Sequence, residues 1–217
     1  MSTPFRMHRA RVETLVDGVF AIAMTILVLE VKVPDLVDRR SAEELLLALW
    51  HHGYVIAAYF FSFAMLAVFW VWHHRLAEKI RDIDFPLLVC IIVFLSLVCF
   101  FPFATALLGR YPLNLTALLV YVPLTGLIVL VQTLFYAIAI RRKLIDESVS
   151  TEAMLMAHRR NLLGCGIFVL ASVPTLLRLD PFVALGGAVL GGLIFWRAKK
   201  LAHLPGKPID AASKRNI

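Results

Sequence analysis

Three carboxylates interrupt the first apolar stretch of the chain, RVETLVDGVFAIAMTILVLEVKVP (residues 11–34). Glu13, Asp17 and Glu30 can accept hydrogen bonds or pair with cations, and ionisable groups at membrane depth mark ion or substrate pathways. Between Asp17 and Glu30 only 12 residues are free of charge. At about 1.5 Å per residue they cover roughly 18 Å, against ~30 Å of bilayer hydrocarbon. Such a helix has to be shielded from lipid by other helices.

Helical geometry separates the acids from a second face of the same segment. At about 100° per residue, Asp17 and Glu13 lie on one side of the helix and Glu30 lies at its outer end. The opposite stripe consists of Arg11, Leu15, Gly18, Ile22, Thr25, Ile26 and Leu29. Periodicity alone fits a packed helical core or a pore lining, and the packed core is the commoner case.

The other reactive side chains form no metal or catalytic motif. His51 and His52 are adjacent, as are His73 and His74, so the side chains of each pair point about 100° apart on a helix. The three cysteines lie inside apolar runs, without the spacing of a metal site or a disulfide framework. HExxH, CxxC and nucleophile-elbow sequences do not occur. The sequence therefore predicts no enzyme, no metal site and no bound cofactor.

The elements that carry these residues are predicted to be membrane helices. The 217 residues are 60% hydrophobic and 17% charged, with a mean hydropathy of +0.82. A soluble domain is closer to half apolar and a quarter charged. The formal net charge is +7, but the basic residues lie between apolar runs, where they set membrane topology. We therefore expect no nucleic-acid partner.

Five further apolar runs follow the first and predict an all-α membrane protein with six transmembrane helices. They cover residues 53–72, 85–108, 112–140, 161–177 and 181–196. A span needs about 17 to 25 residues, more where the helix is tilted. A polar helix within residues 41–53 is expected to lead into the second span. Residues 1–200 are predicted to form one transmembrane domain and residues 201–217 a basic, disordered cytoplasmic tail.

The distribution of Lys and Arg predicts the orientation in the membrane. With both termini inside, the inner segments hold 17 of the 22 Lys and Arg and the outer loops hold five. Short cytoplasmic loops carry an excess of positive charge in membrane proteins. We therefore expect a multi-pass protein of the cell membrane, surrounded by lipid, with both termini in the cytoplasm.

The first segment also resembles the signature helix of the transmembrane-protein-175 family, the endosomal and lysosomal potassium channels and their prokaryotic relatives. The matching residues are Arg11, Asp17, Ala21, Ile22, Thr25, Leu29, Glu30 and Pro34. Trp70 and His73 resemble the family's Trp-x-x-His at the end of its second span, and Pro102 resembles the end of its third. One departure is that Leu15-Val16 stands where the family has Phe-Ser, which removes a hydroxyl close to Asp17.

The resemblance implies both an assembly and an activity. Family members with one six-span repeat form homotetramers around four copies of the first helix, so Ile22, Ile26 and Leu29 are the implied pore lining. Ile22 is the implied hydrophobic gate at the neck, and Thr25 is the implied contributor to potassium preference. The chain lacks the Thr-Val-Gly-Tyr-Gly carbonyl filter. The implied function is passive conduction of monovalent cations, with a preference for K⁺.

Arg11, Asp17, Trp70 and His73 are expected to form a polar network that fastens the first helix to the second near the cytoplasm. Asp17 faces away from the stripe and needs a partner there. A pH-sensing role for His73 is an alternative, because histidines titrate near neutral pH. The alternative functions are a proton-conducting channel and a proton-coupled small-solute transporter. Transporters commonly show internal repeats and broken helices, and neither is evident.

Overall fold

The computed structural model describes residues 6–112, 114–146, 156 and 159. Within them lie four helices that are long and apolar enough to cross a membrane. The spans predicted at 161–177 and 181–196 and the tail at 201–217 fall outside the described residues. The four helices are α1 (Arg9–Ile26), continued by the 3₁₀ helix η1 (Leu27–Glu30), then α3 (Gly53–Ala77), α4 (Phe85–Arg110) and α5 (Leu115–Arg141). The predicted number of six spans and their orientation stay predictions.

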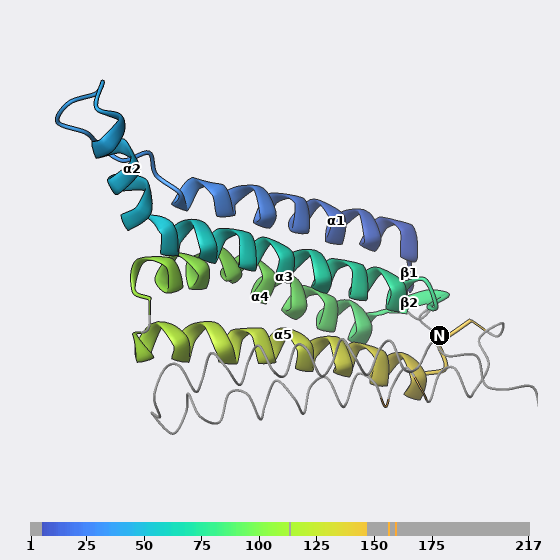
Figure 1. Ribbon diagram of the computed structural model, residues 1–217. Helices are drawn as coiled ribbons and strands as arrows, with labels where there is room; N and C mark the ends of the chain where they lie inside the picture. The colour runs from blue at the N-terminus through green and yellow to red at the C-terminus, as the bar shows by residue number, and fades with distance from the viewer. Residues whose placement is uncertain (1–5, 113, 147–155, 157–158, 160–217) are drawn as a thin grey trace, which may run out of the picture.

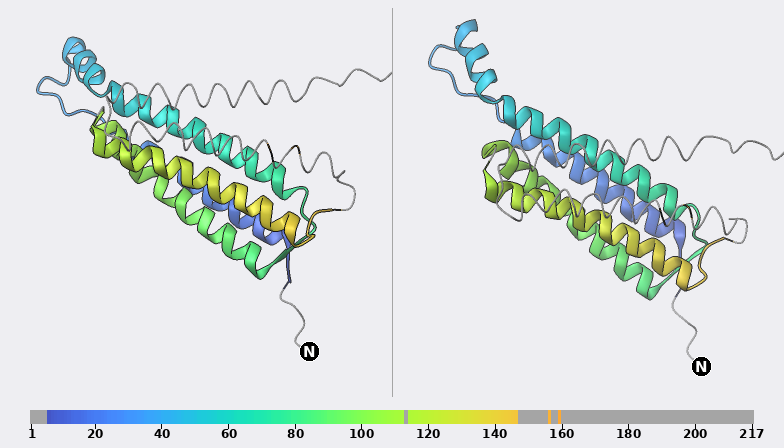
Figure 2. Two further views of the ribbon diagram at one scale, coloured as in Figure 1. Left: turned by 90° about the horizontal axis from the view of Figure 1, so that it is seen from below. Right: turned by 60° about the horizontal axis from the view of Figure 1, so that its bottom comes forward.

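The four helices lie side by side as an all-helical bundle (Figures 1 and 2). Helix α4 contacts α1, α3 and α5, and so forms the centre of the described part. Helix α3 runs five residues beyond its apolar run, because His74 and Arg75 occupy its last turn, where cations favour the negative end of the helix dipole. Helix α5 begins three residues later than predicted, at the point where the Asn114 side chain accepts a hydrogen bond from the Thr116 amide at 2.9 Å.

One face of each helix builds the core, which is rich in large apolar side chains. The largest fully buried ones on these helices include Phe20, Leu66, Phe69, Phe94, Phe101 and Phe135. Several buried polar groups are bonded to each other or to the backbone: Ser62 Oγ lies 3.0 Å from the Tyr121 hydroxyl, and Gln132 Nε2 donates to the Phe69 carbonyl at 3.2 Å. Such pairing is needed because an unbonded polar group in an apolar interior costs several kcal/mol.

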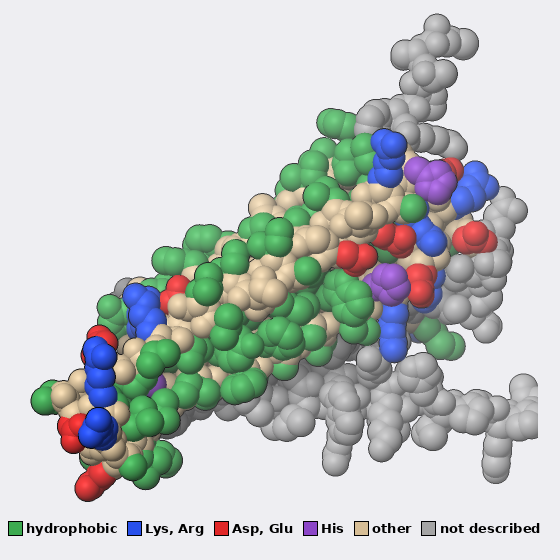
Figure 3. Space-filling model, turned by 90° about the horizontal axis from the view of Figure 1, so that it is seen from above, with side chains coloured by type: hydrophobic (Ala, Val, Ile, Leu, Met, Phe, Trp, Pro, Cys, Tyr) green, Lys and Arg blue, Asp and Glu red, His purple; other side chains and the backbone are tan. Residues whose placement is uncertain are grey.

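The outer surface shows the pattern of a membrane protein. Figure 3 shows a broad band of hydrophobic side chains between two ends where Lys, Arg, Asp and Glu gather. Large apolar side chains such as Phe60, Ile92 and Phe103 are more than half exposed. In water such a surface would aggregate, whereas in a bilayer it is solvated by lipid.

A small two-stranded sheet lies at one end of the bundle. The sequence does not predict this sheet. Strands β1 (Arg6–His8) and β2 (Asp82–Asp84) pair antiparallel, with Met7 opposite Ile83. Three residues are too few to show an alternating pattern, so no strand signal precedes them. The sheet ties the start of α1 to the α3–α4 loop. Asp84 strengthens this end, because its carboxylate caps α4 at the Leu87 amide (3.1 Å) and also pairs with Arg142.

Helix α2 (Ala42–His51) matches the helix predicted before the second span and stands off the opposite end of the bundle (Figures 1 and 2). Ser41 caps it by accepting a hydrogen bond from the Glu44 amide at 3.2 Å. The Glu44 carboxylate in turn accepts from the amides of Val37 (2.7 Å) and Asp38 (3.0 Å). These backbone hydrogen bonds hold the pKa of Glu44 below its ordinary 4.5.

We expect acid to loosen this loop. A lowered pKa means that the stabilisation from the carboxylate is complete above pH 4.5 and is lost as the pH falls through the folded-state pKa. Glu44→Ala should reproduce the loss at neutral pH, with severalfold faster hydrogen exchange at the amides of Val37 and Asp38. The exposed neighbour Glu43 provides the control Glu43→Ala, which should exchange like the unchanged chain. Equal exchange rates in both variants would contradict the assignment.

Candidate functional site

The predicted stripe on the first helix is a face that the other described residues leave uncovered. Leu15, Ile22, Ile26 and Leu29 are 49%, 60%, 42% and 70% exposed, and Arg11, Gly18 and Thr25 are exposed as well. The residues that point into the core are Val12, Val16, Phe20, Ala23 and Leu27, all of them at most 3% exposed. Helix α1 and η1 therefore bury one face against α3 and α4, and the opposite face is exposed with respect to the described residues.

Asp17 is held from behind by the second predicted span. The indole Nε1 of Trp70 donates a hydrogen bond to Asp17 Oδ1 at 2.8 Å, and the Trp70 ring stacks on His74 at a centroid distance of 5.8 Å. The structure thus brings together two members of the expected polar network. Arg11 is exposed and makes no hydrogen bond or ion pair within the described residues, so it takes no part in this contact.

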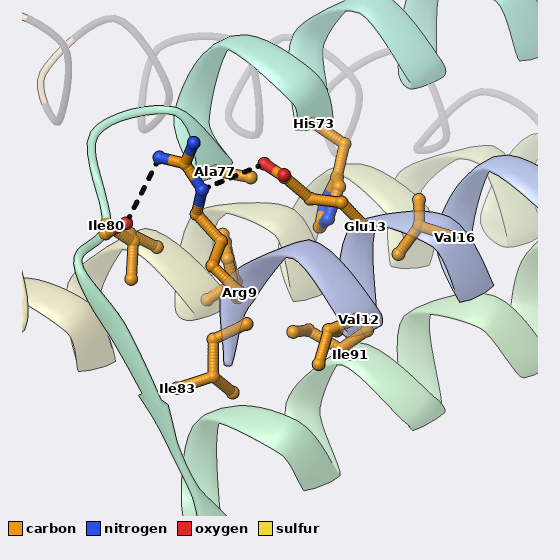
Figure 4. Close-up of a pocket in the computed structure, with 10 residues that line it drawn as sticks. Arg9, Val12, Glu13, Val16, His73, Ala77, Ile80, Ile83 and Ile91 are labelled. Atoms are coloured by element: carbon orange, nitrogen blue, oxygen red, sulfur yellow. Dashed lines mark hydrogen bonds and ion pairs between the residues drawn. The ribbon is translucent and has the colours of Figure 1, made fainter. Parts of the chain in front are cut away.

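His73 lies deeper, between the helices. Its ring is 3% exposed and stacks on Phe94 at 4.8 Å and against Phe135 at 5.0 Å. Among the described residues its Nδ1 has no hydrogen-bond partner. The ring lines a small cavity of about 10 Å³ together with Arg9, Glu13 and Val16 (Figure 4). Val16 stands where the family pattern has a serine, so this position offers no hydroxyl to His73 or to Asp17.

Arg9 also lines this cavity, although it is not among the residues of the expected polar network. Its Nε lies 3.3 Å from Glu13 Oε1, and its Nη1 donates to the Ile80 carbonyl at 3.4 Å (Figure 4). The same Nη1 donates to the Glu78 carbonyl at 2.9 Å. Glu13 is thus neutralised by an arginine four residues earlier. The i, i+4 spacing of Arg9 and Glu13 is the sequence signal that identifies this pair.

The carboxylate at the other end of the helix is also paired. Arg110 Nη2, from the last turn of α4, donates to Glu30 Oε2 at 2.8 Å. The two residues are 80 positions apart, so sequence spacing gives no indication of the contact. Each of the three acids that interrupt the first apolar segment now has a partner, and all of these partners lie off the stripe.

Thr25 is the only polar uncharged side chain of the stripe. Its Oγ1 lies 2.9 Å from the carbonyl oxygens of both Ala21 and Ile22, to which it donates. A hydroxyl has one proton and two lone pairs, so donation to the backbone leaves the lone pairs free to accept. An exposed oxygen of this kind can replace a water molecule around a cation.

The chain is similar to proteins that are named as potassium channels. Residues 11–102 match the family model described as endosomal/lysosomal potassium channel TMEM175. A protein of Chamaesiphon minutus named as a potassium channel is 41% identical over 113 residues, which cover 51% of this chain and 54% of that protein. One of Streptomyces collinus, also named as a potassium channel, is 37% identical over 101 residues, or 46% and 48% of the two chains. The chain spans about half the length of these curated relatives.

The fold is shared over a longer stretch. The crystal structure of a lysosomal potassium-selective channel TMEM175 homolog from Chamaesiphon minutus superposes with a TM-score of 0.73 at 28% identity, covering 88% of this chain and 97% of that one. A bundle of apolar helices, the matched segment at residues 11–102 and this superposition together identify an integral membrane protein that is similar to TMEM175 channels in its first half and in its fold.

Proposed function

We propose that the chain is a potassium-preferring cation channel, in which four copies of α1 line a central pore. The observation that carries the proposal is the uncovered stripe on the family's signature helix. Only 12 uncharged residues lie between Asp17 and Glu30 on this helix, so its apolar centre is too short to face lipid across a bilayer. Symmetry-related copies of the same helix would cover the stripe without burying a charge against lipid.

In such a tetramer, Ile22 would form an apolar ring at the neck of the pore. It is 60% exposed in the single chain and lies on the uncovered face of α1. A ring of four branched apolar side chains can close a narrow pore by dewetting, without any charged group. Ile26 and Leu29 continue the lining toward the end that carries Glu30, and Thr25 supplies the hydroxyls one turn from the ring.

Thr25→Ala should lower the ratio of K⁺ to Na⁺ permeability roughly fivefold, the effect of losing about 1 kcal/mol of oxygen coordination. The measurement is the reversal potential under bi-ionic conditions. Ser96→Ala is the matched control, because Ser96 is an exposed hydroxyl that bonds to the backbone of its own helix α4 at 2.7 Å. A permeability ratio that is the same in Thr25→Ala and in the unchanged chain would remove Thr25 from the proposal.

Flux of K⁺ and Na⁺ through liposomes that contain the purified full chain tests the function as a whole. We expect K⁺ to move faster than Na⁺ without an energy source, and the protein in detergent to have the mass of four chains. A monomer in detergent, or liposomes without cation flux, would contradict the proposal.

Proton conduction is the second candidate. A relative in Bos taurus, 35% identical over 86 residues, is named as an endosomal/lysosomal proton channel; these residues cover 37% of this chain and 18% of that protein. The same liposomes, loaded with a pH-sensitive dye, separate the two activities. Acidification driven by a proton gradient with K⁺ absent from both sides would favour this candidate.

A further inference from the structure

We propose that Arg110 cancels the charge of Glu30 at one mouth of the pore and thereby limits how strongly that mouth attracts cations. The proposal rests on the tetrameric pore proposed above. Its geometric basis is the ion pair in which Arg110 Nη2 lies 2.8 Å from Glu30 Oε2. Glu30 is the last residue of η1 and follows Leu29, the outermost member of the stripe, so the ion pair lies at the end of the helix that would form one mouth of the proposed pore.

The backbone on both sides of the pair is held in place. Arg110 ends α4, and Gly109 beside it is packed so closely on α3 that a Cβ there would lie 3.1 Å from Val55 Cα. Glu30 is fixed by the 3₁₀ turn, in which the Val31 amide donates to the Val28 carbonyl at 3.0 Å. The arginine therefore reaches the glutamate from a rigid neighbouring helix rather than from a loop.

Stabilisation of the fold is a poor explanation for this pair. The Glu30 and Arg110 side chains are 31% and 53% exposed, and exposed ion pairs contribute about 0–1 kcal/mol. The effect of the pair on local charge is larger. Four unpaired carboxylates around a narrow mouth would raise the local cation concentration, and four arginines remove that potential. The next two charged groups along the chain, Lys32 and Asp35, are exposed and of opposite sign.

Conductance as a function of salt tests the proposal in planar bilayers. The Debye length is about 30 Å at 0.01 M and about 3 Å at 1 M ionic strength, so an effect of mouth charge is large in dilute KCl and absent in concentrated KCl. In dilute KCl, Arg110→Gln should raise single-channel conductance about twofold or more, and Glu30→Gln should lower it. Both variants should match the unchanged channel at about 1 M KCl.

Two further variants, E30Q/R110Q and Arg39→Gln, test whether the effect depends on the Glu30–Arg110 pair. Without either charge, the double variant should return to the conductance of the unchanged channel in dilute KCl. Arg39→Gln removes the same charge from an exposed arginine that has no partner within the described residues. Combining it with Glu30→Gln should not reverse whatever change in conductance Arg39→Gln causes. Arg110→Lys keeps the charge and should conduct like the unchanged channel.

The possible results distinguish a failure of the role of Arg110 from a failure of the proposed channel function. Equal conductance of Arg110→Gln and the unchanged channel in dilute KCl, or an increase that persists in concentrated KCl, would overturn the role of Arg110. If Arg110→Gln does not assemble, Glu30→Gln alone decides, and a conductance that it leaves unchanged in dilute KCl overturns the proposal. Absence of cation current in every preparation, including the unchanged chain, would instead contradict the proposed channel function.

Discussion

Replacement of Ile22 by asparagine is expected to convert a mostly closed pore into a leak. Four amide side chains would hydrogen-bond water at the neck, so the constriction would stay wet where four isoleucines exclude water. We expect the resting K⁺ flux through liposomes to rise about tenfold, the result of lowering the barrier by about 1.4 kcal/mol. Single-channel recording should show the same change as a higher open probability.

The control for this variant has to lie on the same helical segment but off the stripe. Val28 is exposed and two residues from Ile26, and Val28→Asn introduces the same amide away from the predicted axis. It should leave the resting flux near that of the unchanged chain. Equal leaks from both variants would mean that asparagine disturbs the bundle in general, and an unchanged flux in Ile22→Asn would remove the gate from Ile22.

The sequence predicts the faces of α1 well because two independent signals agree there. Apolar periodicity and the positions of Asp17 and Glu13 both assign the stripe to one side, and burial of Val12, Val16 and Phe20 defines the other. The partners of the acids are harder to predict. Trp70 is found through the family motif, whereas Arg110 lies 80 residues from Glu30, and only the packing of α4 against η1 brings them together.

The short strands and the exact helix ends are harder to predict from the sequence. Strands of three residues, β1 and β2, carry too few positions for a pattern. The helix ends depend on capping by Asp84 and Asn114, which a hydropathy profile does not register. Helix α2, by contrast, begins at a signal that is local in the sequence, because its cap Ser41 is followed three residues later by Glu44.

The structure explains what the departure at Leu15-Val16 changes. Leu15 lies on the exposed stripe, and Val16 is 3% exposed and lines the cavity next to His73. Valine keeps this position apolar, at the cost of a hydroxyl that could reach a neighbouring polar group. Asp17 keeps a partner through Trp70, so α1 remains fastened to α3 without the serine.

Phe20→Ala is expected to cause the largest loss of stability among single changes on α1. Phe20 is 1% exposed, and its ring lies 5.8 Å from that of Phe94 in α4. Removing a buried phenyl ring costs about 3–5 kcal/mol in soluble cores. Packing rather than water exclusion holds helices together in a bilayer, so we expect the lower end, about 3 kcal/mol. Reversible unfolding in detergent with increasing denaturant measures it, with exposed Ile92→Ala in α4 as the control.

Phe20 and Ile22 together fix the rotation of the helix, because two residues correspond to about 200° and place them on opposite faces. Phe20→Ala should weaken the fold, and the channels that do assemble should keep their K⁺ to Na⁺ ratio. Ile22→Asn should leave the unfolding transition nearly unchanged and open the pore. If the two phenotypes were exchanged, α1 would have to be turned by half a rotation, and neither the uncovered stripe nor the ring at Ile22 would then describe the conduction path.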